Sequence, residues 1–482
     1  MGVGLYTVRA ILDLLGVVDY GIYNVVGGVV SMFAFLNGTL STSSQRYFSI
    51  ELAKGNMRRL NQWFCLNITT FSLFIILFVV IAETVGLWFV NSKMNIPEER
   101  MFAANVVYQL SIISFCINFF SIPYNALIIA HEKMSAFAYI SIVEALLKLG
   151  IVYILSIITW DKLIVYGVLM FLTACSITSS YIIYNHLHFK ESKYHPYWNK
   201  QEIKELISFS GWHFFGTFSV TIRSQGINIL INLFFNPAVN AARAVAFQIY
   251  HAVAQLSNNF FIAVKPQIYK SYAAHDYEGL YKLILRSSIM TSFLISILIY
   301  PILANTQYIL SLWLKEVPEY AVVFTQLVLI NGLIDSINGP TAAAMLATGK
   351  IRNYELLVGG GIILNLPISY IVLKLGGEPT ATIVVSIIIS TYTTLMRAYL
   401  LSKAINLSMK RYIYMFIKLI IASLLIWGCI YLTVYNAAHS LWQLAVYSIA
   451  IVPIVITLYL SIVFERNDAQ YLMNYIRKKK IR

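Results

Sequence analysis

The chain has few charged residues and few cysteines. Charged residues make up 12% of its 482 residues and hydrophobic residues 59%, and its mean hydropathy is +0.71. A typical soluble domain has about 25% charged residues, so this class is excluded. The four cysteines fall within apolar stretches without metal-ligand or disulfide spacing, so we expect them to be packing residues.

Motifs for enzymatic chemistry are also missing. The chain contains no GxxxxGK[ST] phosphate loop, no GxSxG turn and no HExxH zinc motif. No loop is long enough to form a separate domain, because the longest covers only about 189–203. We therefore expect a protein that is not an enzyme and that needs no metal or other cofactor.

The sequence does contain fourteen apolar stretches separated by short loops. A helix needs about 20 apolar residues to cross a bilayer, and the long runs without alternation exclude a β-barrel. They predict an all-α polytopic membrane protein whose first helix is truncated, because 1–15 is too short to cross alone. The predicted spans are 1–15, 20–50, 62–91, 101–130, 134–159, 163–188, 204–235, 240–264, 281–313, 320–347, 352–375, 379–403, 412–436 and 441–464.

The number of basic residues in a loop depends on the side of the membrane on which the loop is predicted to lie. One set of loops, together with the C-terminal tail, carries 23 Lys and Arg residues. The opposite set carries five, namely Lys93, Arg100, Lys162, Lys315 and Lys374. By the positive-inside rule the first set is cytoplasmic, and so is the C-terminus. The net charge of +14 is thereby explained without nucleic acid.

The sequence also indicates an internal repeat of six helices. A shift of 220 residues aligns the polar loop 52–60 with 272–280. A shift of 217 aligns Asn118, Pro123, Ala130 and Lys133 with Asp335, Pro340, Ala347 and Lys350. Six helices return the chain to the same side, so the halves are parallel repeats. The predicted parts are an N-terminal lobe 1–188, a cytoplasmic connector 189–203, a C-terminal lobe 204–404, and helices 13 and 14 with a basic tail in 405–482.

Prolines within three predicted spans mark candidate helix interruptions. These prolines are Pro123, Pro340 and Pro367. Pro340 follows Gly339 and is the best candidate for a broken helix, because proline removes a helical hydrogen bond. A kink repacked by neighbouring helices is the open alternative.

Charged residues within the predicted spans carry the functional argument. A charge in hydrocarbon costs roughly 2.5–3.5 kcal/mol, so each must face a cavity, a partner or an interface. Most are basic, which favours an anionic substrate because arginine binds phosphate or carboxylate in a bidentate way. The basic residues are Arg9, Arg46, Lys148, Arg223, Arg243, Arg397 and Lys418.

Arg46 is the strongest candidate for a substrate-binding residue. It follows the polar run Ser41–Gln45, which indicates a water-filled cavity. Arg223 lies among Thr221, Ser224 and Gln225, whereas Lys418 is expected to snorkel and Arg397 is left open. The full predicted substrate-binding set is Arg46, Arg223, Arg243, Arg9, Asn258 and Asn259.

Three further residues are candidates for energy coupling. Glu144 and Lys148 are spaced i,i+4 and either neutralise each other or line a cavity wall. Asp335 stands alone among apolar neighbours, near Asn331, and is the best candidate for a group that gains and loses a proton. An ion pair with an arginine is its structural alternative.

The segment Leu14–Gly28, followed by Ser44-Gln-Arg-Tyr-Phe48, resembles the start of the Wzx-type polysaccharide flippases. These belong to the MOP exporter superfamily, which also holds the MATE transporters and the lipid II flippases. The resemblance implies a MATE-like bundle of six plus six helices with an extra C-terminal pair. By position, Arg46 matches a basic residue of the family's helix 2. Arg9 and Arg243 resemble basic residues that lipid II flippases place on helices 1 and 8.

The resemblance also implies a function. It is the translocation of undecaprenyl-pyrophosphate-linked oligosaccharide across the bacterial inner membrane by alternating access, for lipopolysaccharide (O-antigen), capsule or exopolysaccharide synthesis. The implied partners are this lipid-linked substrate, membrane lipids, and the polymerase and glycosyltransferases of the pathway.

Other functions fit the sequence less well. A MATE-type multidrug or cation antiporter is the alternative, and it would need an acidic pocket. A membrane glycosyltransferase or ligase would need a carboxylate cluster, and Asp13, Asp19 and Glu378 are too scattered. A structural scaffold would leave the embedded arginines unexplained.

Overall fold

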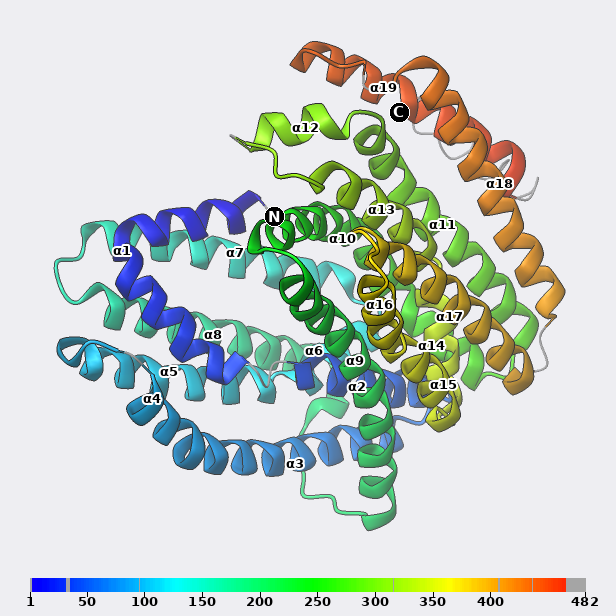
Figure 1. Cartoon of the computed structure of the whole chain (residues 1–482). Coiled ribbons are helices and arrows are strands. Elements are labelled where there is room, and N and C mark those ends of the chain that lie inside the picture. Colours follow the sequence, from blue (N-terminus) through cyan, green and yellow to red (C-terminus); the bar gives the residue numbers. More distant parts are fainter. Residues whose placement is uncertain are drawn as a thin grey trace, which may run out of the picture. The chain divides into compact units, whose positions relative to one another are not determined.

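The described part of the chain is helical and contains no strand (Figure 1). The structure is a computed structural model, and it describes residues 2–31, 35–94, 96–314, 316–405, 408–435 and 437–464. The predicted all-α membrane fold is confirmed. By its internal packing the chain divides into two compact units, unit 1 (Met1–Phe214) and unit 2 (Phe215–Arg482).

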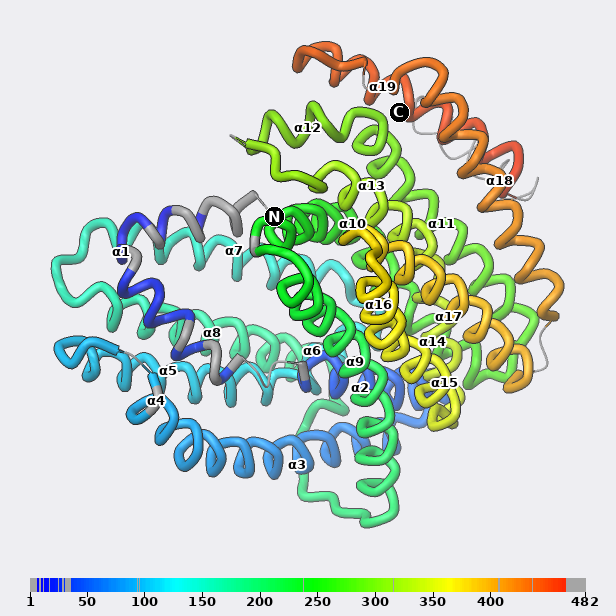
Figure 2. Tube along the Cα trace, in the orientation of Figure 1, coloured from blue at the N-terminus to red at the C-terminus, as the bar shows by residue number. Residues whose placement is uncertain are grey.

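The described part of unit 1 is built from eight α-helices, three short 3₁₀ or π segments and the first part of a ninth α-helix. The chain can be followed from blue to green in Figure 2. Its elements are α1 (Gly2–Ser31), α2 (Phe35–Ala53), α3 (Met57–Ile81), η1 (Ala82–Gly86), α4 (Leu87–Lys93), η2 (Glu98–Arg100), α5 (Met101–Phe120), α6 (Ile122–Ala130), α7 (Met134–Ile157), α8 (Lys162–His188), η3 (Lys190–Ser192) and the start of α9 (Lys200–Phe234).

The described part of unit 2 contains the rest of α9, ten further α-helices and one short π segment. Within it, α10 lies against α11, α13 and α14, and α17 lies against α13, α14 and α15. The elements are α10 (Pro237–Ala273), α11 (Tyr277–Ala304), α12 (Thr306–Trp313), α13 (Ala321–Asp335), α14 (Asn338–Thr348), α15 (Arg352–Ile363), α16 (Asn365–Lys374), α17 (Ala381–Ile405), α18 (Met409–Thr433), α19 (Leu441–Leu458) and η4 (Tyr459–Val463).

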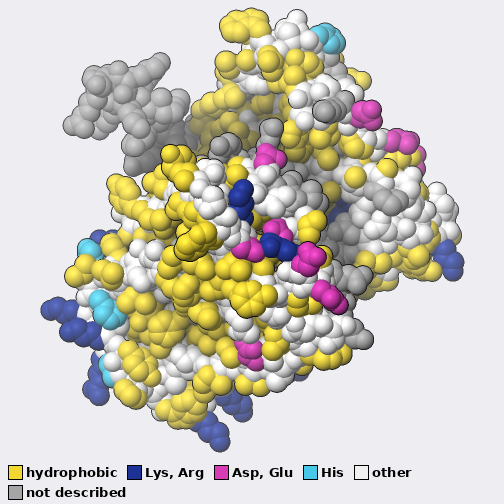
Figure 3. Space-filling view, turned by 90° about the vertical axis from the view of Figure 1, so that its left-hand side faces the viewer, with side chains coloured by type: hydrophobic (Ala, Val, Ile, Leu, Met, Phe, Trp, Pro, Cys, Tyr) yellow, Lys and Arg dark blue, Asp and Glu magenta, His cyan; other side chains and the backbone are white. Residues whose placement is uncertain are grey.

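Nine helical segments of the described chain are long and apolar enough to cross a membrane, or ten if the bent pair α13–α14 is one span. Hydrophobic side chains accordingly cover much of the face shown in Figure 3. The helices α1, α2, α9 and α10 occupy other predicted spans and are not among the nine. Three of them carry the predicted site residues Arg46, Arg223 and Arg243.

The structure corrects the predicted second span and places a break next to the end of the first. Helix α1 consists of two helical parts that meet at Gly16, just after the predicted span 1–15. The backbone of Gly16 is not helical, and its φ of +80° is accessible to glycine because glycine has no Cβ. The predicted single span 20–50 is divided between α1, which ends at Ser31, and α2, which begins at Phe35.

The three prolines predicted to interrupt helices do follow helix breaks. Pro123 comes just after the break between α5 and α6, and Pro367 just after the one between α15 and α16. Pro340 follows the break between α13 and α14, where the two axes differ by 42°. In each case the proline lies in the first turn of the new helix, where its missing N–H costs nothing.

The turns of the two units have matching backbone geometry. At the 220-residue shift, Gly55 (φ +68°) corresponds to His275 (φ +58°), and the next residues, Asn56 and Asp276, both cap a helix with their side chains. At the 217-residue shift, Glu132 (φ +59°) corresponds to Gly349 (φ +73°). Left-handed residues are uncommon outside glycine, so these coincidences support the repeat.

Arg100 joins three helices at the end of unit 1 opposite the start of α3. Its guanidinium donates to both carboxylate oxygens of Asp19 in α1, and its Nη1 lies 2.7 Å from Oδ2 of Asp161, the N-cap of α8. Partial burial opposes ionisation of Asp161. The hydrogen bonds from Arg100 and from the Ile164 and Leu163 N–H groups outweigh it, so the pKa of Asp161 lies below its ordinary value.

The conformation of Gly55 generates a stability test. Gly55→Ala should destabilise the protein by about 1–2 kcal/mol, because alanine must adopt the left-handed conformation although the site has space for a methyl group. Gly38→Ala is the matched control. It also has space but lies within α2, so it should stabilise by about 0.5–1 kcal/mol. Thermal unfolding of purified protein measures both, and equal effects would contradict the assignment.

Candidate functional site

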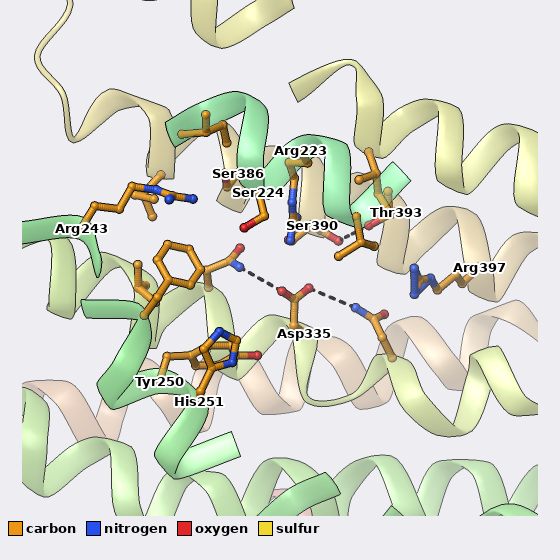
Figure 4. A pocket seen from close by; sticks show the side chains of 18 residues that line it. Arg223, Ser224, Arg243, Tyr250, His251, Asp335, Ser386, Ser390, Thr393 and Arg397 are labelled. Carbon is orange, nitrogen blue, oxygen red and sulfur yellow. Dashed lines mark hydrogen bonds between the residues drawn. The ribbon is translucent and has the colours of Figure 1, made fainter. Parts of the chain in front are cut away.

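A cavity of about 370 Å³ lies within unit 2, and we call it the unit 2 pocket (Figure 4). Its wall combines basic, hydroxyl and amide side chains with apolar ones, and all of them belong to unit 2. The lining residues come from α9 (Val220, Arg223, Ser224 and Ile227), α10 (Arg243, Phe247, Tyr250 and His251), α13 and α14 (Val328, Asn331, Asp335 and Asn338), α15 (Ile362) and α17 (Ile383, Ser386, Ser390, Thr393 and Arg397).

The break between α13 and α14 places polar groups at the pocket. Asp335 is the last residue of α13 and Asn338 is the first of α14. In a continuous helix, the backbone groups at this point would bond to one another. The side chains would then keep the regular helical spacing. The break also exposes helix ends, whose unpaired backbone groups favour polar surroundings.

Three arginines from three helices point into the pocket. Figure 4 shows Arg223, Arg243 and Arg397 approaching the same space from different sides. Arg243 is only 4% exposed; it donates to the Asn228 side-chain oxygen, and its Cζ lies 4.4 Å from the centre of the Phe247 ring. These contacts hold the guanidinium without neutralising its charge.

Several donors in this wall have no hydrogen-bond partner among the described residues. They are Nε of Arg243, Nε of Arg397 and the hydroxyl of Ser390, all buried. An unsatisfied buried polar group costs about 1–3 kcal/mol, and more when it is charged. The pocket is therefore suited to a ligand that brings several hydrogen-bond acceptors.

Asp335 is held by amides and not by an arginine. Its two carboxylate oxygens accept from Nδ2 of Asn331 at 2.9 Å and from Nδ2 of Asn338 at 3.4 Å. In the described residues it forms no ion pair, which contradicts the ion-pair alternative. With three arginines and one aspartate, the pocket is net positive.

The structure brings together three of the predicted site residues, Arg223, Arg243 and Asp335. Arg397, which the sequence left open, joins them. Asn258 and Asn259 do not line this pocket; both are exposed on α10, and the Asn259 side chain accepts from Gln255 at 2.9 Å. The side chain of Arg9 lies outside the described part of the structure, so its role stays a prediction.

Arg46 lies in unit 1, after a polar run that is partly used in helix packing. Ser43 bonds to Ser210 at 2.9 Å and Ser44 donates to Asn67 at 2.8 Å, all buried. Small hydroxyls there join α2 to α9 and α3, because close helix packing needs short polar side chains.

Arg46 itself is 7% exposed and contacts two aromatic rings. Its Cζ lies 4.7 Å from the ring centre of Tyr47 and 4.9 Å from that of Phe209. It also lines a separate pocket of about 400 Å³ with Glu51 and Glu205, so the surrounding charge is mixed. Its substrate-binding role remains a prediction.

Glu144 and Lys148 form an ion pair in α7. Nζ of Lys148 lies 2.6 Å from Oε1 of Glu144, as the i,i+4 spacing predicts. Both side chains are partly exposed within unit 1. Where the chain is described, no group of three or more His, Cys, Asp or Glu side chains could hold a metal ion.

Sequence reasoning missed the hydroxyl wall of the pocket. Ser386, Ser390, Thr393 and Arg397 follow one another at intervals of four, three and four residues along α17. This spacing places them on one face of a helix. A polar stripe along an apolar helix was therefore the signal that would have found them. Tyr250 and His251 carried no comparable signal.

Comparisons with known proteins place the fold among membrane transporters. A multidrug resistance MATE transporter of the MOP superfamily, in an outward-facing conformation, matches with a TM-score of 0.68 and 14% identity over 84% of this chain and 93% of that one. The MATE transporter ClbM in complex with Rb⁺ matches with a TM-score of 0.67 and 14% identity, over 83% and 92% of the two chains.

A third solved structure differs in its pocket. It is a MOP superfamily transporter from Pyrococcus furiosus with a binding pocket of reverse polarity, and it matches with a TM-score of 0.65 and 15% identity over 85% of this chain and 94% of that one. No protein-family model matches the sequence, and no curated protein does. The chain thus has the fold of MATE-like MOP superfamily transporters, and these structural relatives are transporters and not enzymes.

The amide contacts of Asp335 generate a test of stability. Asp335→Asn should leave the expression level and thermal midpoint close to wild type, because no arginine loses an ion-pair partner. Asp19→Asn is the contrasting variant. It removes the partner that Arg100 contacts with two nitrogens, so its midpoint should fall. Heating followed by size-exclusion chromatography measures both, and a large loss for Asp335→Asn would restore the ion-pair interpretation.

Proposed function

We propose that this protein is a flippase for an anionic lipid-linked substrate, and that the substrate is a polyprenyl-pyrophosphate-linked oligosaccharide. The observation that supports this most is the unit 2 pocket, in which three arginines converge and two of them keep an unpaired buried donor. A pyrophosphate group offers many acceptor oxygens and at least two negative charges, which match these donors and the net charge of the wall.

The size of the pocket supports binding of a head group. Its volume of about 370 Å³ is near the lower end of the roughly 300–1,000 Å³ typical of small-molecule sites. A pyrophosphate with an adjoining sugar is of this order, whereas a whole oligosaccharide or a polyprenyl chain is not. Ser224, Ser386 and Ser390 can bond to sugar hydroxyls as well as to phosphate oxygens.

A MATE-type cation antiporter is the second candidate, because two of the structural relatives are MATE transporters and one holds Rb⁺. A cation would need anionic or carbonyl oxygens. The unit 2 pocket offers one carboxylate, already bonded to two amides, against three arginines. This charge balance favours the anionic substrate.

Transport needs a driving force, and we assign proton coupling to Asp335. It is the only acidic side chain among the pocket residues described above, so it is the carboxylate that lies next to the proposed anion. A protonated Asp335 would leave the arginine charges to the substrate, whereas an ionised one would compete for them. Glu144 and Lys148 remain a second coupling candidate in unit 1.

The arginines provide the first functional test. Arg243→Ala and Arg397→Ala should each weaken substrate binding roughly 10- to 100-fold, because a hydrogen bond to a charged group is worth about 1.5–3 kcal/mol. Lysine should restore only part of the loss, since a point charge lacks the planar fork. Arg411→Ala, which removes an exposed arginine outside the pocket, is the control.

Binding is measured by calorimetry with a water-soluble short-chain prenyl pyrophosphate sugar, and export by surface polysaccharide in a flippase-deficient strain. If both alanine variants bind the substrate as the wild type does, at normal expression, the pocket is not the substrate-binding site. Loss of cationic drug resistance, without any change in pyrophosphate binding, would favour the antiporter.

Asp335→Asn tests the coupling. The asparagine imitates the protonated state, so export should fall and should no longer respond to the pH gradient. Proteoliposomes with an imposed gradient measure this, and a potassium diffusion potential at equal pH is the control. Export that keeps its wild-type response to the pH gradient would exclude Asp335 as the coupling group.

A further inference from the structure

A second polar cavity lies in unit 1, far along the chain from the pocket residues. It is a groove of about 850 Å³, and we call it the basic groove. It opens where α3 begins and where α6 and α8 end. The residues that matter here are Arg58, Lys190, Lys193, His131, His188 and His195. By the loop charges, this end of unit 1 is the one predicted to be cytoplasmic.

The groove is built by specific contacts and not by a loose loop. The buried amide of Asn61 in α3 donates to the carbonyl oxygens of Glu191 at 2.7 Å and Lys193 at 2.8 Å. The backbone N–H of His195 donates to Sγ of Cys65 at 3.4 Å. These bonds fix the segment after α8 against α3, so the backbone positions of Lys190 and Lys193 are defined.

The single acidic residue that lines the groove is already engaged. Oε1 of Glu191 lies 2.6 Å from Nε2 of His131, and the His131 ring stacks on Phe189 with centroids 4.0 Å apart. Within the described residues, Arg58, Lys190 and Lys193 form no ion pair, and all three are exposed. The groove therefore presents three uncompensated positive charges.

The groove lies at the boundary of the membrane-spanning segments. The spans Met57–Ser92, Glu98–Ala130 and Lys162–His188 each have one end at it. Just before His188, the apolar side chains Ile183 and Leu187 are 58% and 76% exposed, and their i,i+4 spacing puts them on one face of α8. A ligand in the groove would thus have a charged part among the cations and room for an apolar chain along α8.

We propose that the basic groove binds the phosphate head group of an anionic phospholipid from the surrounding leaflet. Basic pockets at the cytoplasmic ends of membrane helices bind such head groups, because phosphate oxygens accept hydrogen bonds from Arg and Lys. The exposed strip of α8 takes an acyl chain. This site is separate from the unit 2 pocket and does not depend on the proposed transport substrate.

The test uses full-length protein purified in a mild detergent. Native mass spectrometry counts the lipids retained after addition of phosphatidylglycerol, cardiolipin or phosphatidylcholine. The groove variant is Arg58→Gln, Lys190→Gln and Lys193→Gln combined. The control is Lys282→Gln, Lys410→Gln and Arg411→Gln, which removes equal charge from exposed residues of unit 2. We expect the groove variant to bind both anionic lipids at least fivefold more weakly, with the control and phosphatidylcholine unchanged.

Three results would overturn the proposal. An equal loss in both variants would show that only the general surface charge attracts lipid. Retention of phosphatidylcholine to the same extent as cardiolipin would exclude selection for a net negative head group. Displacement of bound lipid by millimolar inorganic pyrophosphate alone would assign the groove to a soluble polyphosphate. If the triple variant does not fold, Lys190→Gln against Lys190→Arg applies the same criteria, because arginine keeps the charge.

Discussion

The structure of unit 2 depends on one constraint, which is the cost of placing arginine inside a membrane protein. Each guanidinium must be surrounded by polar groups or partners, because hydrocarbon solvates a charge so poorly. The hydroxyl stripe of α17, the amides at the end of α13 and the aromatic ring beneath Arg243 provide that environment. Among the described residues, none of the three arginines has an acidic partner, so the charge remains available to a ligand.

Unit 1 meets the same constraint in the opposite way. Outside the basic groove, two of its basic residues are compensated by carboxylates: Arg100 by Asp19 and Asp161, and Lys148 by Glu144. Arg46 lies between aromatic rings, which attract the cation through their π faces. Charges that are compensated in this way stabilise a helix bundle, whereas uncompensated ones destabilise it and suit a binding site.

Much of this could be predicted from residue types and spacing. Hydropathy runs predicted helices, and the three prolines predicted breaks, because backbone hydrogen bonding is a local property. The 220- and 217-residue shifts pointed to turns that share a left-handed residue at Gly55 and His275, and at Glu132 and Gly349. Arg223, Arg243 and Asp335 stood out because charge is rare in apolar segments.

What could not be predicted depends on neighbours distant in sequence. The serines before Arg46 look like the wall of a cavity, but whether a hydroxyl faces water or Asn67 depends on how α2 meets α3. Asp335 looks the same whether an arginine or two amides hold it. The predicted helix end before Gly16 coincides with non-helical backbone in α1, whereas the break between Ser31 and Phe35 had no local signal that separated it from the predicted span 20–50.

The unit 2 pocket has a consequence for the proposed transport cycle, because every residue that lines it belongs to one unit. A rigid movement of that unit would carry the arginines along unchanged, so the affinity for the proposed anion would be the same before and after reorientation. Turnover would then be limited by product release. Water or a newly ionised neighbouring group would have to compete with a tightly bound product for the arginines. Each increase in binding strength would therefore slow the cycle.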